Sequence, residues 1–256
     1  VSPVTKNTYA YWSFDEGSGT KAYDYAFNGY ASEAENSGRG KLDLGLVNGP
    51  KWVSGISGTG IEFDGVDDYL YTHTFSDGFD IRNYYTSTYE LFFKTEATQN
   101  QTLIGLCKNP TQNNCGSEDQ HDLEIIITKE GQLGFRFTNH DSSSSDFPKI
   151  LSEESFNDGF WHHVAVIISY SNEESNAHIS LYADGELVDA QSPISCCYSH
   201  NSYYWKIGAG EWGFGDNGDN GEFSPFKGVL DSIRISNVEL LPSDFLFNTP
   251  GFEMLL

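Results

Sequence analysis

The sequence predicts an all-β protein, and three observations support this. Short segments of alternating or continuously apolar residues recur about a dozen times along the chain. Glycine, with 26 residues, and asparagine punctuate these segments, as turns between strands require. No segment predicts a helix beyond a single turn near residues 242–247. The length of 256 residues suits one large β-sandwich, residues 1–256, better than two small domains.

The clearest strand pattern lies between Asp158 and Val188. Residues 164–168 are apolar on both faces, which indicates a central strand covered on both sides. In residues 179–183 apolar and polar side chains alternate, as in a half-buried strand. Asp184-Gly185 then supplies the positive φ angles of a tight hairpin turn.

The other strands are expected on both sides of this pair. In chain order they are residues 8–14, 60–65, 66–71, 87–94, 102–106, 122–128, 132–138, 202–208 and 227–236. Residues 31–52 are rich in Gly, Asn and Ser and are expected to cross the edge of the sandwich as loop. Residues 209–225 are expected to form a glycine-rich acidic loop.

The formal net charge of -23 restricts the classes of partner. A negative field repels nucleic acid, anionic membranes and strongly anionic polysaccharides unless a local basic cleft or bound cations intervene. It is compatible with cation binding, with neutral glycans or simply with solubility. No apolar run approaches the roughly 20 residues that span a membrane, so membrane insertion is not expected.

The four cysteines point to an oxidising compartment. An even number suits two disulfides in a secreted or cell-surface protein, and Val1 in place of an initiator Met suggests a processed N-terminus. Four cysteines allow three pairings. Because a bridge between the adjacent Cys196 and Cys197 is strained, we expect both to reach across to Cys107 and Cys115.

Several motifs resemble one family. They are Tyr11-Trp-Ser-Phe-Asp-Glu-Gly17, Phe63-Asp-Gly-Val-Asp-Asp-Tyr69, Asp158-Gly-Phe-Trp-His-His-Val164 and Leu181-Tyr-Ala-Asp-Gly185. Together they resemble the laminin-G-like and pentraxin group of concanavalin-A-like jelly rolls, over residues 9 to 240. The resemblance implies a two-sheet antiparallel jelly-roll sandwich, and it places His162-His163 at ordinary strand positions. That fold hosts lectins, lyases, glycosidases and adhesion domains, so it does not fix a function.

Asp231 is the most informative acidic residue. In an unbroken strand its carboxylate would share a face with the core residues Val229, Ile233 and Ile235. A buried unpaired charge is very costly, so Asp231 needs a cation or several donors. The alternatives are backbone amides, Arg234, or a bulge that turns the residue to solvent.

The resemblance favours the cation. In related jelly rolls an acid at the position of Asp231 helps to bind a structural Ca²⁺ together with the N-terminal loop. Here that loop offers Asp15 and, shortly after it, Asp24. Hard oxygen ligands of this kind suit Ca²⁺.

Ligand recognition is the function that we expect, for a glycan or an extracellular protein. Tyr203, Trp212 and Phe214 are the candidate ligand-binding residues, since flat aromatics stack on sugar rings; packing in the core is the alternative for them. A structural subunit that self-associates is a further possibility.

A polysaccharide-degrading enzyme is the remaining alternative. The closely spaced carboxylate signature of a retaining sandwich glycosidase is absent, which favours a lyase within this class. Arg136 and His140 are the candidate catalytic pair, one to neutralise a uronate and one to act as base. The chain has only 14 Lys and Arg residues, which argues against this chemistry.

Overall fold

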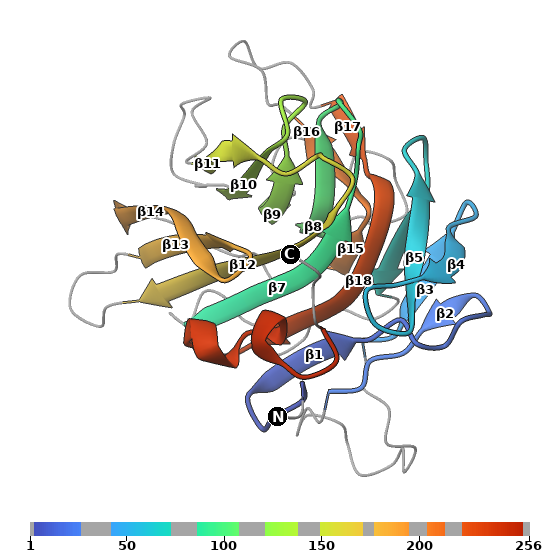
Figure 1. Ribbon diagram of the computed structural model, residues 1–256, viewed down its shortest axis with the longest axis horizontal. Coiled ribbons are helices and arrows are strands. Elements are labelled where there is room, and N and C mark those ends of the chain that lie inside the picture. Colours follow the sequence, from blue (N-terminus) through green and yellow to red (C-terminus); the bar gives the residue numbers. More distant parts are fainter. Residues whose placement is uncertain are drawn as a thin grey trace.

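The computed structural model describes residues 3–26, 42–72, 86–107, 121–137, 149–170, 177–194, 204–212 and 222–252. Two eight-stranded antiparallel sheets, sheet A and sheet B, pack face to face, and a two-stranded hairpin accompanies them (Figure 1). This arrangement confirms the predicted two-sheet antiparallel jelly-roll sandwich. Among the described residues no helix is long and apolar enough to cross a membrane.

The sheets combine pairs of consecutive strands with pairs of strands that are distant in sequence. Sheet A runs β14 (Glu186–Ile194), β13 (Ala177–Ala183), β12 (Trp161–Tyr170), β7 (Ser87–Lys94), β18 (Lys227–Ser236), β5 (Thr59–Asp64) and β4 (Lys51–Ser54), with β1 (Thr8–Trp12) paired to β18. Sheet B runs β11 (Lys149–Ser155), β10 (Gln132–Phe137), β9 (His121–Ile127), β8 (Gln101–Cys107), β15 (Tyr204–Ile207), β6 (Tyr69–Thr72), β3 (Leu44–Val47) and β2 (Lys21–Ala22). The hairpin joins β16 (Ala209–Trp212) to β17 (Glu222–Pro225).

Strand β12 is the covered central strand that its sequence predicts. It lies between β7 and β13, and Val164 and Val166 face the core between the sheets. On its other face, Ala165 and Ile167 pack against Phe245. The segment after β18, which contains the 3-10 turns Pro242–Asp244 and Leu246–Asn248, therefore covers the outer face of sheet A (Figure 1).

The predicted hairpin after β13 is also confirmed. Asp184 and Gly185 have φ angles of 50° and 83°, the left-handed values that this tight turn requires. Gly185 additionally leaves room for the ring of Phe247, which lies 3.1 Å from where a Cβ would be. The turn therefore helps to seat the C-terminal segment.

A register shift interrupts β18 between Asp231 and Arg234. Ser232 has a φ of 47°, the left-handed backbone typical of such bulges. Leu230 and Ile235 face the core on either side of it, whereas Asp231 lies opposite Phe92 on the outer face of sheet A. The expectation that Asp231 shares a face with Ile233 and Ile235 is therefore wrong, because the extra residue resets the alternation.

Several strands are absent from the sequence expectation. Residues 31–52 are expected as loop but include β3 and the start of β4, and residues 209–225 contain β16 and β17. Strands β3, β4, β16 and β17 have four residues each, which is too short for a period of two to stand out from turn composition. Strands β3 and β4 form because they hydrogen-bond to β6 and β5, and not because their own sequence has a strand pattern. The seven-residue strand β11 is not expected either, because its sequence is polar after Leu151.

Candidate functional site

The outer face of sheet A carries charged side chains at both ends of β7. Leu91 and Phe93 belong to the core, so their neighbours Glu90, Phe92 and Lys94 point outward. Glu90 is buried at one end of this row and Lys94 is exposed at the other. The two ends differ in what covers them.

At the Lys94 end lies a cleft of about 700 Å³, whose floor is formed by β4, β5, β18 and β7. We call it the lysine cleft and define it by Lys51, Lys94, Lys227, Glu62, Asp64 and Asp68. These side chains come together through the strand register. Lys51 lies opposite Glu62, Glu62 opposite Val229, and Val229 opposite Lys94, while Asp64 lies opposite Lys227.

Two glycines lie close to the lysines of the cleft. Gly228 lies between the two charged rows with a φ of 151°, and a Cβ there would come within 2.2 Å of the Lys94 carbonyl oxygen. Gly65, with a φ of 79°, allows the aliphatic stem of Lys227 to fold against it. Side chains at these two positions would clash with the Lys94 backbone and with the Lys227 stem, so both glycines allow the close packing around the two lysines.

Within the described chain, Lys51, Lys94 and Lys227 form no ion pair, although each is close in register to a carboxylate. The positive charge of Lys51 acts on Asp68 and partly offsets the rise of its carboxyl pKa. By contrast, Arg136 pairs with Glu124. The lysine ammonium groups of the cleft are therefore available to a ligand.

The acidic side of the cleft is a rigid turn. Asp64 Oδ1 accepts a hydrogen bond from the Val66 amide at 2.8 Å, and Asp68 Oδ2 accepts one from the Asp64 amide at 3.0 Å. Burial raises the pKa of Asp68, and the nearby charges of Asp64 and Asp67 raise it further. Carboxylate oxygens of Asp64, Asp67 and Asp68 lie within 4.8 Å of one another, an arrangement of ligands that a cation could use.

Two of the most exposed large apolar side chains are close in sequence to residues that line the cleft. Phe160 is 69% exposed and directly follows Gly159, which lines the cleft; Val66 is 66% exposed and lies in the turn between Asp64 and Asp68. The Phe160 turn is fixed by a hydrogen bond from the Gly159 amide to the Thr95 carbonyl at 2.9 Å. Sequence reasoning missed this site, although a phenylalanine directly after Asp158-Gly159 marks an aromatic ring in a turn.

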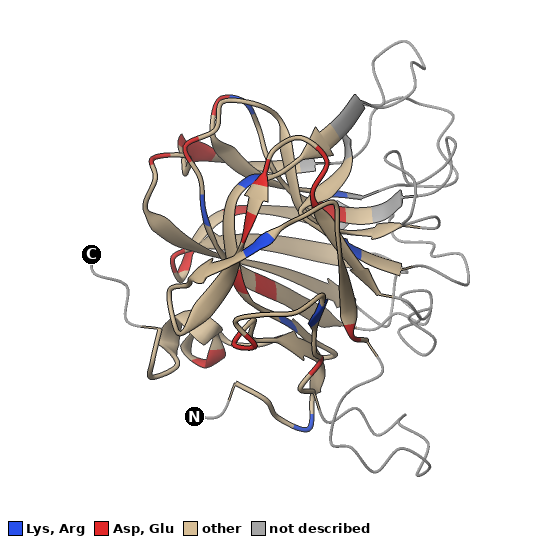
Figure 2. Cartoon of the chain, turned by 90° about the vertical axis from the view of Figure 1, so that its right-hand side faces the viewer, with Lys and Arg blue, Asp and Glu red and all other residues tan. Residues whose placement is uncertain are grey.

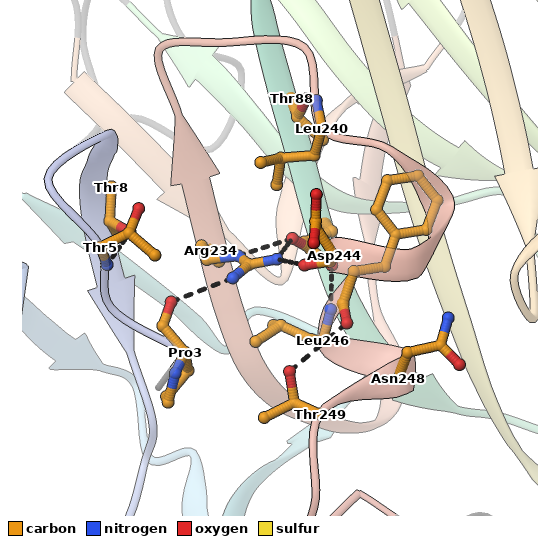
Figure 3. A network of polar contacts seen from close by, with 12 residues as sticks. Pro3, Thr5, Thr8, Thr88, Arg234, Leu240, Asp244, Leu246, Asn248 and Thr249 are labelled. Atoms are coloured by element: carbon orange, nitrogen blue, oxygen red, sulfur yellow. Dashed lines mark hydrogen bonds and ion pairs between the residues drawn. The ribbon is translucent and has the colours of Figure 1, made fainter. Parts of the chain in front are cut away.

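At the Glu90 end the charges are buried and paired. Arg234 donates from Nε to Glu90 Oε1 at 2.6 Å, and His163 Nε2 lies 3.0 Å from Glu90 Oε2. The Leu246 amide donates to the same Oε2 at 2.7 Å, and Arg234 also donates to the carbonyl oxygen of Asp244 at 2.7 Å (Figure 3). Burial raises the pKa of Glu90, but His163 and Arg234 outweigh it and hold the pKa below its usual value.

The predicted metal ligand Asp231 is buried against a backbone turn. Its Oδ2 accepts from the Ile56 and Ser57 amides at 2.9 and 3.2 Å, and Ser232 donates to its Oδ1 at 3.1 Å. Of the alternatives to a cation, Asp231 accepts hydrogen bonds from backbone amides and lies at a bulge. Arg234 pairs with Glu90 and not with Asp231. Burial raises the pKa of Asp231 to about 7 despite these donors.

The other two predicted calcium ligands make separate contacts. Asp15 is exposed, and its Oδ1 accepts from the Thr59 amide at 3.2 Å, so it meets the same 55–59 turn as Asp231. Asp24 is buried and accepts from the Tyr11 and Ala26 amides at 3.0 and 2.8 Å. Burial raises its pKa to about 6. Asp15 and Asp231 thus contact the same turn, and Asp24 belongs to different contacts.

The candidate catalytic residue Arg136 lies on the outer face of sheet B. The register aligns Tyr71, Lys206, Glu124 and Arg136 across that face. Arg136 is buried and paired with Glu124, and Lys206 Nζ lies 4.5 Å from the ring centre of Tyr69. The guanidinium that a lyase would turn toward a uronate is thus already balanced by a carboxylate. Its proposed partner His140 lies outside the described residues.

The remaining predicted residues are placed only in part. Tyr203 and Phe214 lie outside the described residues, while Trp212 ends strand β16, where its backbone pairs with Glu222. Cys107 is buried at the end of β8. Its predicted partner, Cys196 or Cys197, and the fourth cysteine, Cys115, lie outside the described residues, so the disulfide pairing stays a prediction.

The two adjacent histidines of β12 both make structural contacts. His162 Nδ1 lies 2.8 Å from Asp184 Oδ2, and its Nε2 lies 3.0 Å from Asp158 Oδ1. These contacts tie the Asp158–Phe160 turn to the β13–β14 hairpin. Burial lowers the pKa of His162, but the two carboxylates outweigh it and raise the pKa above its usual value.

Solved structures with the same fold are binding domains. One is the binding domain of Paraclostridial Mosquitocidal Protein 1, with 13% identity and a TM-score of 0.62 over 94% of this chain and 52% of that chain. The binding domain of botulinum neurotoxin DC matches in a complex with SialylT, with 12% identity, a TM-score of 0.59 and coverage of 94% and 51%. It also matches in a complex with rat synaptotagmin II, with 11% identity, a TM-score of 0.61 and coverage of 94% and 51%. The chain thus spans about half the length of these structures, and at such identities the likeness concerns the fold alone.

Sequence comparison identifies the family. No curated protein sequence matches the chain significantly. A family model described as the concanavalin A-like lectin/glucanases superfamily, of laminin G type, matches residues 64–244. The match covers most of the chain, and it includes the motifs around Asp64, His162 and Leu181 on which the resemblance was based. The chain therefore belongs to the concanavalin A-like lectin/glucanases superfamily.

Proposed function

We propose that this chain is an extracellular recognition module that binds a glycan in the lysine cleft. The single observation that carries the proposal is the state of the cleft's charges. Three ammonium groups and the carboxylates of Glu62, Asp64 and Asp68 line one accessible hollow without ion pairs between them. Charges that serve stability in this protein are paired and buried, as at Glu90.

The groups at the cleft match the chemistry of a sugar. Ammonium groups donate to ring and hydroxyl oxygens, carboxylates accept from hydroxyl groups, and such charge-assisted hydrogen bonds are the strong ones. Phe160, exposed next to Gly159 of the cleft, offers a flat apolar surface on which the face of a sugar ring can stack. A pocket with a few convergent polar groups and an aromatic wall is the usual form of a small-ligand site.

The structural neighbours support a binding role, for a glycan or a protein. They are binding domains, one in a complex with SialylT and one in a complex with rat synaptotagmin II. A protein partner is the second candidate, and the exposed Phe160 and Val66 would then serve as apolar anchors.

A glycan array followed by calorimetry tests the proposal. Phe160→Ala should weaken binding of the best array ligand about tenfold, because one stacking contact is lost. Leu187→Ala is the matched control, since Leu187 is also an exposed apolar residue, at 55%, but lies away from the cleft in β14. The control should bind like the wild type. Equal affinity in both variants, or no glycan bound on the array, would overturn the glycan proposal.

We also propose a structural Ca²⁺ beside the 55–59 turn, held by Asp15 and Asp231. The support is that both carboxylates meet this turn and that Asp231 is a buried carboxylate whose charge a cation would compensate. Chelation should lower the melting temperature of the wild type and leave that of Asp15→Asn unchanged. Asp67→Asn, in the second acidic group, should respond to chelation like the wild type. An unchanged wild-type melting temperature would refute the calcium site.

Secretion is part of the same proposal and is supported by the four cysteines. Mass spectrometry of the protein without reduction should give two disulfides, each joining one residue of the pair Cys196-Cys197 to Cys107 or Cys115. Free thiols in protein from an oxidising compartment would contradict it.

A further inference from the structure

We propose that the glycan bound in the lysine cleft carries one carboxylate group, held by Lys94 and Lys227, on an otherwise uncharged sugar chain. This inference rests on the proposed function and names the ligand class of the same site. It follows from how the charges are distributed within the cleft, from the charge of the whole chain and from the exposed Phe160.

Charges of both signs line the cleft: Glu62 and Asp64 on β5 lie between Lys51 on β4 and Lys227 on β18, and Glu96 follows Lys94. Lys94 on β7 and Lys227 on β18 lie on neighbouring strands, and two register positions separate them. Diagonal neighbours of this kind are about 7–8 Å apart, a gap that two lysine side chains can close around one anion. On the next strand, β5, stand Glu62 and Asp64, which lie opposite Val229 and Lys227.

The spacing of these charged groups fits one sugar residue. Adjacent strands are about 4.8 Å apart, which is close to the width of a pyranose ring. A ring whose carboxylate reaches Lys94 and Lys227 therefore brings its hydroxyl groups to the carboxylates of Glu62 and Asp64. Those carboxylates are acceptors, so they favour hydroxyl groups and disfavour a second anion.

The charge of the whole chain limits the ligand to few charges. Of the 14 Lys and Arg residues, three line this cleft, within a chain of net charge -23. Figure 2 shows how basic positions are interspersed among the acidic ones on the described strands and turns. A polyanion would extend beyond the cleft into this negative field, whereas a single carboxylate stays between the two lysines. A neutral glycan would leave the two ammonium groups without a charged partner.

Phe160 orients the same ring. It follows Gly159, which lines the cleft together with Thr95 and Glu96. A ring that stacks on Phe160 presents its edge to the lysines, and the edge is where a carboxylate substituent projects. The lysines and Phe160 would therefore contact the same sugar residue, the lysines at its carboxylate and Phe160 at its ring face.

The test compares three matched glycans that differ at one group: a chain ending in a hexuronate, the methyl ester of that hexuronate, and the parent hexose. Calorimetry at low and high salt should give at least tenfold tighter binding for the hexuronate than for its ester. This preference should shrink at high salt, because exposed charges are screened. A polyuronate should bind no better than the single hexuronate chain.

Variants assign the preference to the lysines. Lys94→Met with Lys227→Met should reduce hexuronate affinity about tenfold or more and change ester affinity less than twofold. Lys129→Met is the control, because Lys129 is an exposed lysine in the β9–β10 turn, and it should change neither.

The outcomes separate this inference from the proposed function. If the acid and its ester bind equally and Phe160→Ala weakens both, the cleft is a glycan site and the carboxylate inference is wrong. If a hexose sulfate binds and the hexuronate does not, the anion is a sulfate ester and the inference is wrong as well. If no glycan binds, both proposals fail.

Discussion

The two ends of the outer face of sheet A use the same strands for opposite purposes. Glu90 and Lys94 both point outward from β7, and Arg234 and Lys227 both belong to β18. Glu90 and Arg234 are buried under the segment that follows β18, and each has several partners. Lys94 and Lys227 are exposed and have no ion pair in the described chain.

The difference shows that burial under the C-terminal segment, more than residue type, determines whether a charged side chain is paired within the protein or left exposed. Under the C-terminal segment, a charge without a partner would lose its hydration and gain nothing in return. At the open end, the same charge keeps its water until a ligand arrives, so it costs the fold little. Stability and the proposed ligand binding are therefore assigned to different ends of one strand.

Breaking the buried pair should give the largest effect. Arg234→Met leaves Glu90 buried with only His163 and the Leu246 amide as partners, and we expect unfolding free energy to fall by about 3–5 kcal/mol. Urea denaturation followed by tryptophan fluorescence measures it. Adding Glu90→Met to Arg234→Met should recover part of the loss, because no lone buried charge remains. If Arg234→Met alone lowers the unfolding free energy by less than about 1 kcal/mol, burial does not strengthen the contribution of this ion pair to stability.

His162, on the same β12 strand as His163, gives a pH-dependent prediction of intermediate size. The pKa of His162 is raised, so its protonated form stabilises the fold. This contribution is complete below about pH 6.5, the usual value of an unfolded histidine, and is lost as pH rises through the raised pKa. The unfolding free energy of His162→Gln should therefore fall short of the wild type by up to about 1 kcal/mol at pH 5.5, and by less at pH 8.5. A constant deficit across this range would contradict the assignment.

The smallest effect on stability is expected at the open end. Lys94→Met with Lys227→Met should change unfolding free energy by less than about 0.5 kcal/mol, because both side chains are exposed and unpaired. The same denaturation assay measures it, with Lys129→Met as the exposed control. A loss of unfolding free energy as large as that of Arg234→Met would contradict the difference in stability contribution between the exposed and buried ends of the sheet face.

Much of the fold could be predicted from the sequence, because long strands carry their own pattern. Residues 87–94 and 227–236 are strands with the predicted bounds, and the two apolar faces of β12 correctly indicate cover on both sides. The four-residue strands β3, β4, β16 and β17 could not be read, since their order comes from partners far along the chain.

The candidate site was harder to predict, and the reason is register. Lys51, Lys94 and Lys227 are more than 40 residues apart from one another, and only the pairing of β4, β5, β18 and β7 brings them together. The bulge at Ser232 likewise has no mark in the sequence, so the face of Asp231 was assigned wrongly. The pairing of a buried Asp231 with several donors, in contrast, followed from the cost of an unpaired carboxylate.

The bulge at Ser232 also has an evolutionary consequence. It divides β18 into two stretches whose inward and outward positions are set independently, residues 227–231 toward the cleft and 233–236 toward the buried pair. Substitutions in the first stretch therefore leave the alternation of the second untouched. The exposed part of the first stretch, beside the cleft, should tolerate changes as a surface does, whereas the stretch around Arg234 should tolerate them only as a core does.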